Sequence, residues 1–175
     1  MVFVIFSTGF SMSHAAECAL KPIQIHQITP ERRDVFVGKG ERVQLEFNNF
    51  STGEEIEVFP EPPLVVRRLS KKGVACKIGG GIWTRKDVFL SKDESTLLVR
   101  EYSGSNDSLV FYDTGSCKRR DEIDVSGARW SVSGSKVVVG TQCQDDTLAS
   151  CRSIRRQTLN GACRPAHVGK KRTRD

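Results

Sequence analysis

The sequence has few of the residues that carry catalytic chemistry. It contains three histidines, of which His14 lies in an N-terminal segment that we expect to be removed and His167 lies near the C-terminus. No Gly-x-Ser-x-Gly sequence and no histidine pair at helical spacing occurs, so the motifs of serine and zinc hydrolases are absent. The stretch KIGGGIW matches neither a phosphate-binding loop nor a dinucleotide fingerprint. We predict that the protein is not an enzyme and holds no cofactor or metal.

Carboxylate pairs are the remaining route to catalysis. They occur in predicted loops and strand edges with basic neighbours, where charged side chains are ordinarily solvated. A carboxylate-dependent hydrolase is therefore the last of three functional hypotheses. The candidates are Glu54 and Glu55 with Glu57, Asp121 with Glu122, and Asp145 with Asp146.

The sequence also lacks an apolar run long enough to span a bilayer. Residues 1–16 contain no Asp, Glu, Lys or Arg, residues 2–10 are largely apolar, and Ser13-His14-Ala15 fits the signal-peptidase rule. This pattern predicts a signal peptide over residues 1–15 and a secreted or periplasmic mature protein. Because Glu17 precedes Cys18, where a lipoprotein signal needs a small residue, we expect no lipid anchor.

Positive charge is concentrated at the C-terminus. The formal net charge is +6, and the last twelve residues, RPAHVGKKRTRD, contribute +4 of it. This segment is short and has no aromatic residue on which a base would stack. We expect residues 166–175 to form a basic, disordered tail and the protein to have no specific nucleic-acid partner.

No segment after the signal shows a helical period. Gly, Pro, Asp, Asn and Ser clusters instead separate short runs of apolar and β-branched residues, as in antiparallel strands. The pattern predicts one all-β antiparallel domain over residues 16–165. The runs cover residues 23–28, 42–47, 64–69, 88–90, 96–102, 108–112, 122–125 and 136–141.

Three segments of the chain are alike and predict about three repeated units. Each begins with an aromatic residue, turns through polar residues and enters a strand, and each is followed by a Gly, a Cys and a basic residue. The three cysteines are 41 and 46 residues apart, close to the length of a β-propeller blade. The segments read FVGKGERVQLEF from Phe36, FLSKDESTLLVREY from Phe89 and WSVSGSKVVVGT from Trp130.

Residues 80–127 resemble a blade of the WD-repeat and related propellers. The resemblance rests on VFLSKDESTLLVREY and LVFYDTGSCKR, although Glu94 stands where the blade turn usually has Gly. It implies propeller-like sheets whose loops form a binding face. Because about three units are fewer than a closed propeller needs, an open stack and a compact β-sandwich both remain possible.

Six cysteines in a chain with a signal peptide indicate disulfides formed in an oxidising compartment. Six cysteines allow 15 pairings. The runs VVVGT and RSI favour a hairpin that pairs Cys143 with Cys151, whereas the pairing of the other four stays open. A bond between Cys76 and Cys117 would favour the sandwich over the stack. The other two cysteines are Cys18 and Cys163.

These features favour a non-catalytic binding domain for an unknown protein or cell-envelope component. A second hypothesis is an inhibitor of a secreted hydrolase, with the loop between Cys143 and Cys151 as a rigid plug. Trp83 and Trp130 stand beside apolar strand residues at similar places in two units, so we expect them to pack in the core.

Overall fold

The computed structural model describes residues 17–28, 34–49, 56–60, 63–70, 76–79 and 81–166. In this part of the chain, fourteen strands pair antiparallel in three sheets, and the prediction of an all-β antiparallel fold is confirmed. Its single helical segment is a 3-10 turn, η1 (Leu148–Ser150), so no helix long and apolar enough to cross a membrane is found there. The predicted signal peptide and all but Ala166 of the predicted tail lie outside the described residues.

The middle layer, sheet A, has apolar side chains on both faces. In strand β9, Leu97 and Val99 point into one core and Leu98 points into the other. Alternation of side chains across a strand therefore explains why its sequence is a continuous apolar run. The sheet consists of β1 (Leu20–Pro22), β8 (Ile82–Ser91), β9 (Thr96–Ser103), β10 (Asn106–Asp113) and β11 (Arg119–Asp124), in that order, with β5 (Val58–Phe59) also paired to β8.

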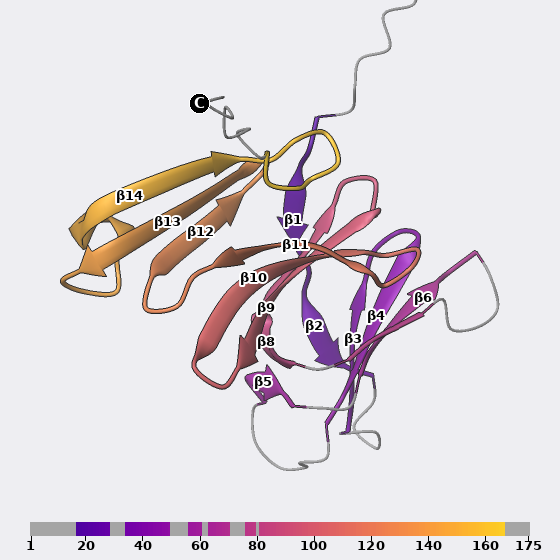
Figure 1. Cartoon of the computed structure of the whole chain (residues 1–175). Coiled ribbons are helices and arrows are strands. Elements are labelled where there is room, and N and C mark those ends of the chain that lie inside the picture. Colours follow the sequence, from indigo (N-terminus) through magenta and orange to yellow (C-terminus); the bar gives the residue numbers. More distant parts are fainter. Residues whose placement is uncertain are drawn as a thin grey trace, which may run out of the picture.

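Sheet B covers one face of sheet A (Figure 1). Its strand β4 alternates buried and half-buried residues, as expected for a strand with one face in a core. Phe36, Phe47 and Phe59 pack together in this first core, with the Phe47 and Phe59 ring centroids 4.6 Å apart. The sheet consists of β2 (Ile25–Gln27), β3 (Val35–Lys39), β4 (Val43–Asn48), β6 (Leu64–Arg68) and β7 (Cys76–Ile78).

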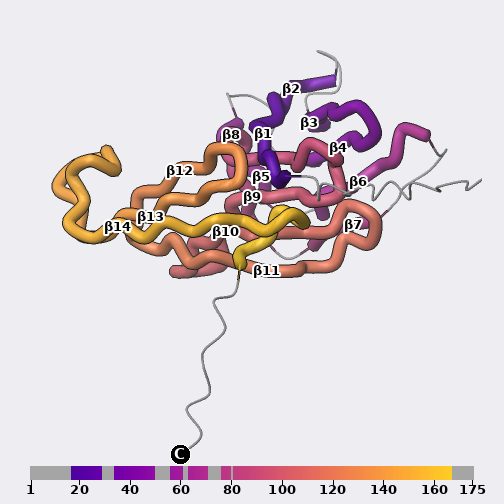
Figure 2. Tube along the Cα trace, turned by 90° about the horizontal axis from the view of Figure 1, so that it is seen from above, coloured from indigo at the N-terminus to yellow at the C-terminus, as the bar shows by residue number. Residues whose placement is uncertain are grey.

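Sheet C packs on the opposite face of sheet A and then extends beyond it. Val137 and Val139 meet Leu98, Leu109 and Phe111 in the second core. Figures 1 and 2 show the far end of this sheet projecting away from the other two. It consists of β12 (Arg129–Ser133), β13 (Lys136–Cys143) and β14 (Cys151–Thr158), and we call residues 129–158 the arm.

The resemblance to propeller blades is wrong. The three predicted units form the hairpins β3–β4, β8–β9 and β12–β13, which lie in three different layers packed face to face. Cys76 of β7 is bonded to Cys117 of the β10–β11 turn, with their Cα atoms 5.7 Å apart. This bond joins sheets B and A directly, whereas equivalent outer positions of adjacent blades would lie too far apart to bond. The sequence pattern resembled propeller blades because each unit is a hairpin with a polar turn, which is also the feature that blades share.

A carboxylate also ties sheet A to sheet B. Glu94, in the β8–β9 turn, accepts hydrogen bonds from the backbone N–H groups of Glu41, Arg42 and Val43 at 2.6, 2.9 and 2.8 Å. Gly40 makes room for it, since a Cβ there would lie 2.5 Å from a Glu94 carboxylate oxygen. The β3–β4 turn thus gains acceptors that its own backbone does not supply.

Candidate binding surfaces

The structure does not assemble the candidate carboxylates into one site. Glu57 precedes β5, Asp121 and Glu122 lie on β11, and Asp145 and Asp146 lie in the loop at the tip of the arm. Glu54 and Glu55 are outside the described residues. Across the described ranges no group of three or more His, Cys, Asp and Glu residues is arranged to hold a metal ion.

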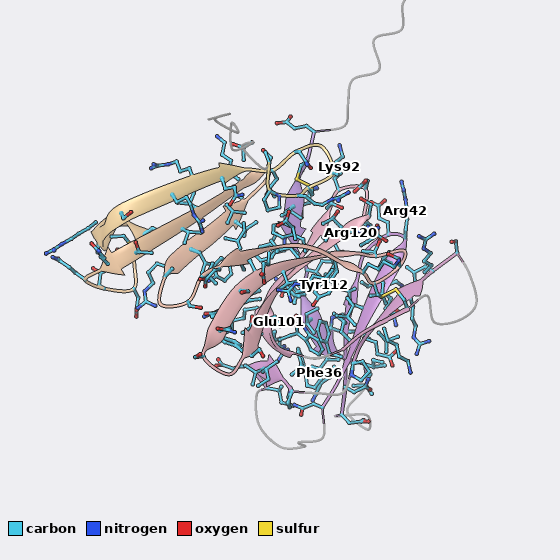
Figure 3. The ribbon with its side chains drawn as sticks, in the orientation of Figure 1. Phe36, Arg42, Lys92, Glu101, Tyr112 and Arg120 are labelled. Carbon is cyan, nitrogen blue, oxygen red and sulfur yellow. A yellow bond between two sulfur atoms is a disulfide. The ribbon has the colours of Figure 1, made fainter. Side chains whose placement is uncertain are left out.

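The structure places the two tryptophans in or against the cores and His26 on the surface. Trp83 is fully buried in the first core, and Trp130 packs, partly buried, against the second. His26 is exposed on β2, whereas His167 lies outside the described residues. Glu101, which lies opposite Trp83 on the neighbouring strand, accepts a hydrogen bond of 2.7 Å from the Tyr112 hydroxyl (Figure 3). Burial together with this bond raises the pKa of Tyr112.

The tip of the arm is a short loop closed by the Cys143–Cys151 disulfide, the pair that the hairpin pattern favoured. Asp145 accepts hydrogen bonds of 2.7 Å from both the N–H and the hydroxyl of Thr147, and these bonds lower its pKa. Gly140 lets the loop fold back on the sheet, because a Cβ there would lie 2.6 Å from the Cys151 sulfur. The loop at the tip is therefore held in shape by a disulfide and hydrogen bonds between its own residues.

Strand β14 forms one edge of the arm and is unusually open. None of its residues is fully buried, and its three arginines, Arg152, Arg155 and Arg156, are exposed. Elsewhere in the described part of the chain, Arg67, Arg100, Arg119, Arg120 and Arg129 each face a carboxylate of the same chain. No ion pair of this kind joins an arginine of β14 to a carboxylate of the described residues. Arg155 nevertheless donates a hydrogen bond of 3.5 Å to the Asp124 carbonyl oxygen, and, after hydrogen bonds from Ser126, its charge helps to lower the pKa of the Asp124 carboxyl.

A second surface surrounds Arg100 of β9, where sheet A meets Trp130 of sheet C. The guanidinium bonds Asp107 through two nitrogens, at 2.9 and 2.6 Å, and this pairing raises the pKa of Arg100. It also lies 4.7 Å from the Tyr102 ring centroid and 5.7 Å from that of Trp130. Ile82 pairs with Tyr102 across the strands and is 39% exposed. This surface combines apolar and aromatic side chains with the positive charge of Arg100, which the Asp107 carboxylate neutralises.

The stretch YDTGSCKR forms the tight turn that presents Cys117 to Cys76. Asp113 accepts hydrogen bonds from the N–H groups of Gly115 and Ser116 at 3.1 and 2.8 Å, and Arg120 donates another at 3.0 Å. Cys117 follows with a φ of 55°, which a non-glycine residue rarely adopts. Partial burial would raise the pKa of Asp113, but hydrogen bonds from Ser116 and Arg120 outweigh it and lower the pKa.

We expect Asp113→Asn to destabilise the protein by about 1 kcal/mol at neutral pH, because an amide oxygen accepts these bonds more weakly. The native pKa is lowered, so the stabilisation is present above the unfolded pKa of about 3.9 and is lost as pH falls through the native value. Urea unfolding at several pH values should therefore show the two proteins converging below about pH 4. A constant difference down to the lowest pH would contradict this role.

Comparison with known proteins decides the family. The family model described as "Immune protein Tsi1" matches residues 18–163, nearly all of the three-sheet fold. The curated Immune protein Tsi1 of Pseudomonas aeruginosa PAO1 is 34% identical over 158 residues, covering 88% of this chain and 90% of the relative. The chain belongs to the Immune protein Tsi1 family. Because the match covers nearly the whole fold, it overturns the resemblance to the WD-repeat and related propellers.

The name of the family indicates a protective role and not a catalytic one. The protein has a non-catalytic binding role, and the prediction that it is not an enzyme is confirmed. Sequence reasoning found the closed loop of the arm but missed the Arg100 surface and the open edge of β14. Both depend on which strands lie side by side, and the sequence does not specify that.

Proposed function

We propose that this protein is an immunity protein that binds a toxin and blocks its action. The observation that carries the proposal is the family match, which spans residues 18–163 and both cores. A protein of this kind needs a rigid surface complementary to its target more than reactive groups. The arm and the Arg100 surface supply fixed side chains held by a disulfide, by hydrogen bonds and by ion pairs.

We further propose that the protein acts outside the cytoplasm, in the periplasm or beyond. All six cysteines are paired in the structure, and structural disulfides persist in oxidising compartments. The signal-like sequence of residues 1–16 supports the same location. The protein would then bind the toxin in the same compartment in which the toxin acts.

A second, narrower proposal is that the toxin is a secreted hydrolase and that the loop between Cys143 and Cys151 obstructs its active site. The loop projects at the end of the arm (Figure 1), is closed by a disulfide and is fixed by Asp145 and Ser150, whose hydroxyl is 3.1 Å from the Asp145 nitrogen. A loop fixed in advance loses little conformational entropy on binding.

A toxicity selection tests the main proposal. Genes of the organism that encodes this protein are expressed in a heterologous bacterial host with an export signal, and those that kill the host are retained. We expect co-exported protein to restore growth against at least one such toxin and to form a stable complex with it when both are purified. The same protein lacking residues 1–16 should restore no growth against an exported toxin. Rescue of no toxin would refute the proposed function.

A further inference from the structure

We propose that the toxin binds along the open edge of β14, where an extended acidic segment of the toxin adds to sheet C as a fourth strand. This inference rests on the proposed function and names the contact through which it operates. The backbone of residues 151–157 would supply the affinity, and the three arginines Arg152, Arg155 and Arg156 the selectivity. Peptide addition to a sheet edge is a known mode of recognition between proteins.

The backbone of β14 offers unpaired groups along one side, except at its C-terminal end, where the Thr158 carbonyl oxygen accepts a hydrogen bond of 3.3 Å from the Ala166 N–H. Sheet C has the order β12–β13–β14, so in the described part of the chain β14 pairs on one side only, with β13. The strand is eight residues long and its register with β13 runs from Cys151 to Thr158, which leaves the other edge extended up to Gln157. Such an edge presents a row of N–H and C=O groups, and proteins usually cover or shorten it.

The positive charge of β14 indicates that the strand added by the toxin is acidic. Its three arginines are exposed, and none of them forms an ion pair with a carboxylate within the described residues. Of the other arginines in the same ranges, five form such a pair and four do not, so β14 is distinguished by three exposed arginines on one edge strand and not by the lack of ion pairs. Exposed arginines on an edge strand are suited to carboxylates supplied by a partner, because guanidinium binds carboxylate through two nitrogens.

The same charges argue against a second copy of this chain as the occupant. Two β14 strands side by side would place arginines of one copy against arginines of the other, and like charges on paired strands are destabilising. The arginines therefore protect the edge from self-association while leaving it open to an acidic segment.

The arm holds this edge in place before binding. Strand β13 contributes Val137 and Val139 to the second core, and the Cys143–Cys151 disulfide links the ends of β13 and β14 at the tip. The Arg155 side chain also reaches back to the Asp124 carbonyl oxygen after β11. A strand fixed in this way loses little freedom when another strand joins it.

The first experiment uses the toxin recovered by the selection above and a matched pair of triple variants. In the test variant, Arg152, Arg155 and Arg156 are replaced by Glu. In the control, Lys21, Lys77 and Lys92, which are exposed on other strands and turns, are replaced by Glu with the same change in net charge. Circular dichroism and thermal unfolding of both variants show that the fold is retained.

We expect the β14 variant to bind the toxin at least about 100-fold more weakly than the wild type, and the control variant to bind within about threefold of it. Wild-type binding should weaken as salt is added. Binding by the β14 variant that equals the control would overturn the inference while leaving the proposed function intact. Failure of the wild type to protect against any toxin would refute both.

Hydrogen exchange distinguishes strand addition from a contact made by side chains alone. Amides of β14 on the open edge should exchange rapidly in the free protein and become protected in the complex. The outer edge of β11, which is also the last strand of its sheet, serves as the internal control. Protection confined to β11 or to residues around Arg100, with β14 unchanged, would overturn the inference.

Discussion

Replacing Cys18 and Cys163 together by serine is expected to lower the free energy of unfolding by about 4–5 kcal/mol. This disulfide joins positions 145 residues apart, more than either of the other two bonds spans. It therefore restricts the unfolded chain most, and the entropy restored to that chain on its removal is correspondingly large. Since small domains are stable by only about 5–15 kcal/mol, the variant should be marginally folded.

The Cys143–Cys151 disulfide provides the matched control, because it closes a loop between positions only eight residues apart. Replacing these two cysteines by serine should cost about 2–3 kcal/mol. Urea unfolding followed by circular dichroism, with all proteins oxidised, measures both values. Equal losses in the two variants would contradict the view that loop length sets the difference.

Local sequence patterns predicted the strands of the middle layer well. The runs Leu97-Leu98-Val99 and Leu109-Val110-Phe111 are apolar at consecutive positions because sheet A is covered on both sides. Strand β13 and the turn before Cys117 also follow from β-branched runs and turn residues. These features are local, so the sequence contains what is needed to predict them.

The arrangement of the layers could not be predicted in the same way. Cys18 bonds to Cys163, and the choice among 15 pairings depends on which chain segments meet in space. Short strands such as β5 and β7 have two and three residues, too few to show a period. The repeat pattern does not distinguish the two folds, because three hairpins with polar turns have similar sequences whether they lie in one ring or in three stacked sheets.

The candidate surfaces depend on the same long-range information. Arg100 is one basic residue among many in the sequence, and its position beside Asp107, Tyr102 and Trp130 arises only when three strands are aligned. The arginines of β14 are readable as RSIRR, but that they are exposed beside an open strand edge follows from the position of β14 in its sheet.

The second large effect is expected at Trp83, the largest side chain in the first core. Its exposed fraction is 0%, and it packs between sheets A and B. Trp83→Ala should lower the free energy of unfolding by about 3–5 kcal/mol, because it removes this apolar contact area and leaves a cavity. Chemical denaturation at neutral pH measures the loss.

The indole nitrogen of Trp83 makes the prediction sharper. This buried N–H has no hydrogen-bond acceptor among the described residues, and an unsatisfied buried donor costs about 1–3 kcal/mol. Trp83→Phe removes the donor and keeps most of the apolar ring, so its loss should be less than half that of Trp83→Ala. If both variants lose the same stability, the N–H has an acceptor in solution, such as a bound water, and the hydrogen bond rather than the packing holds the residue in place.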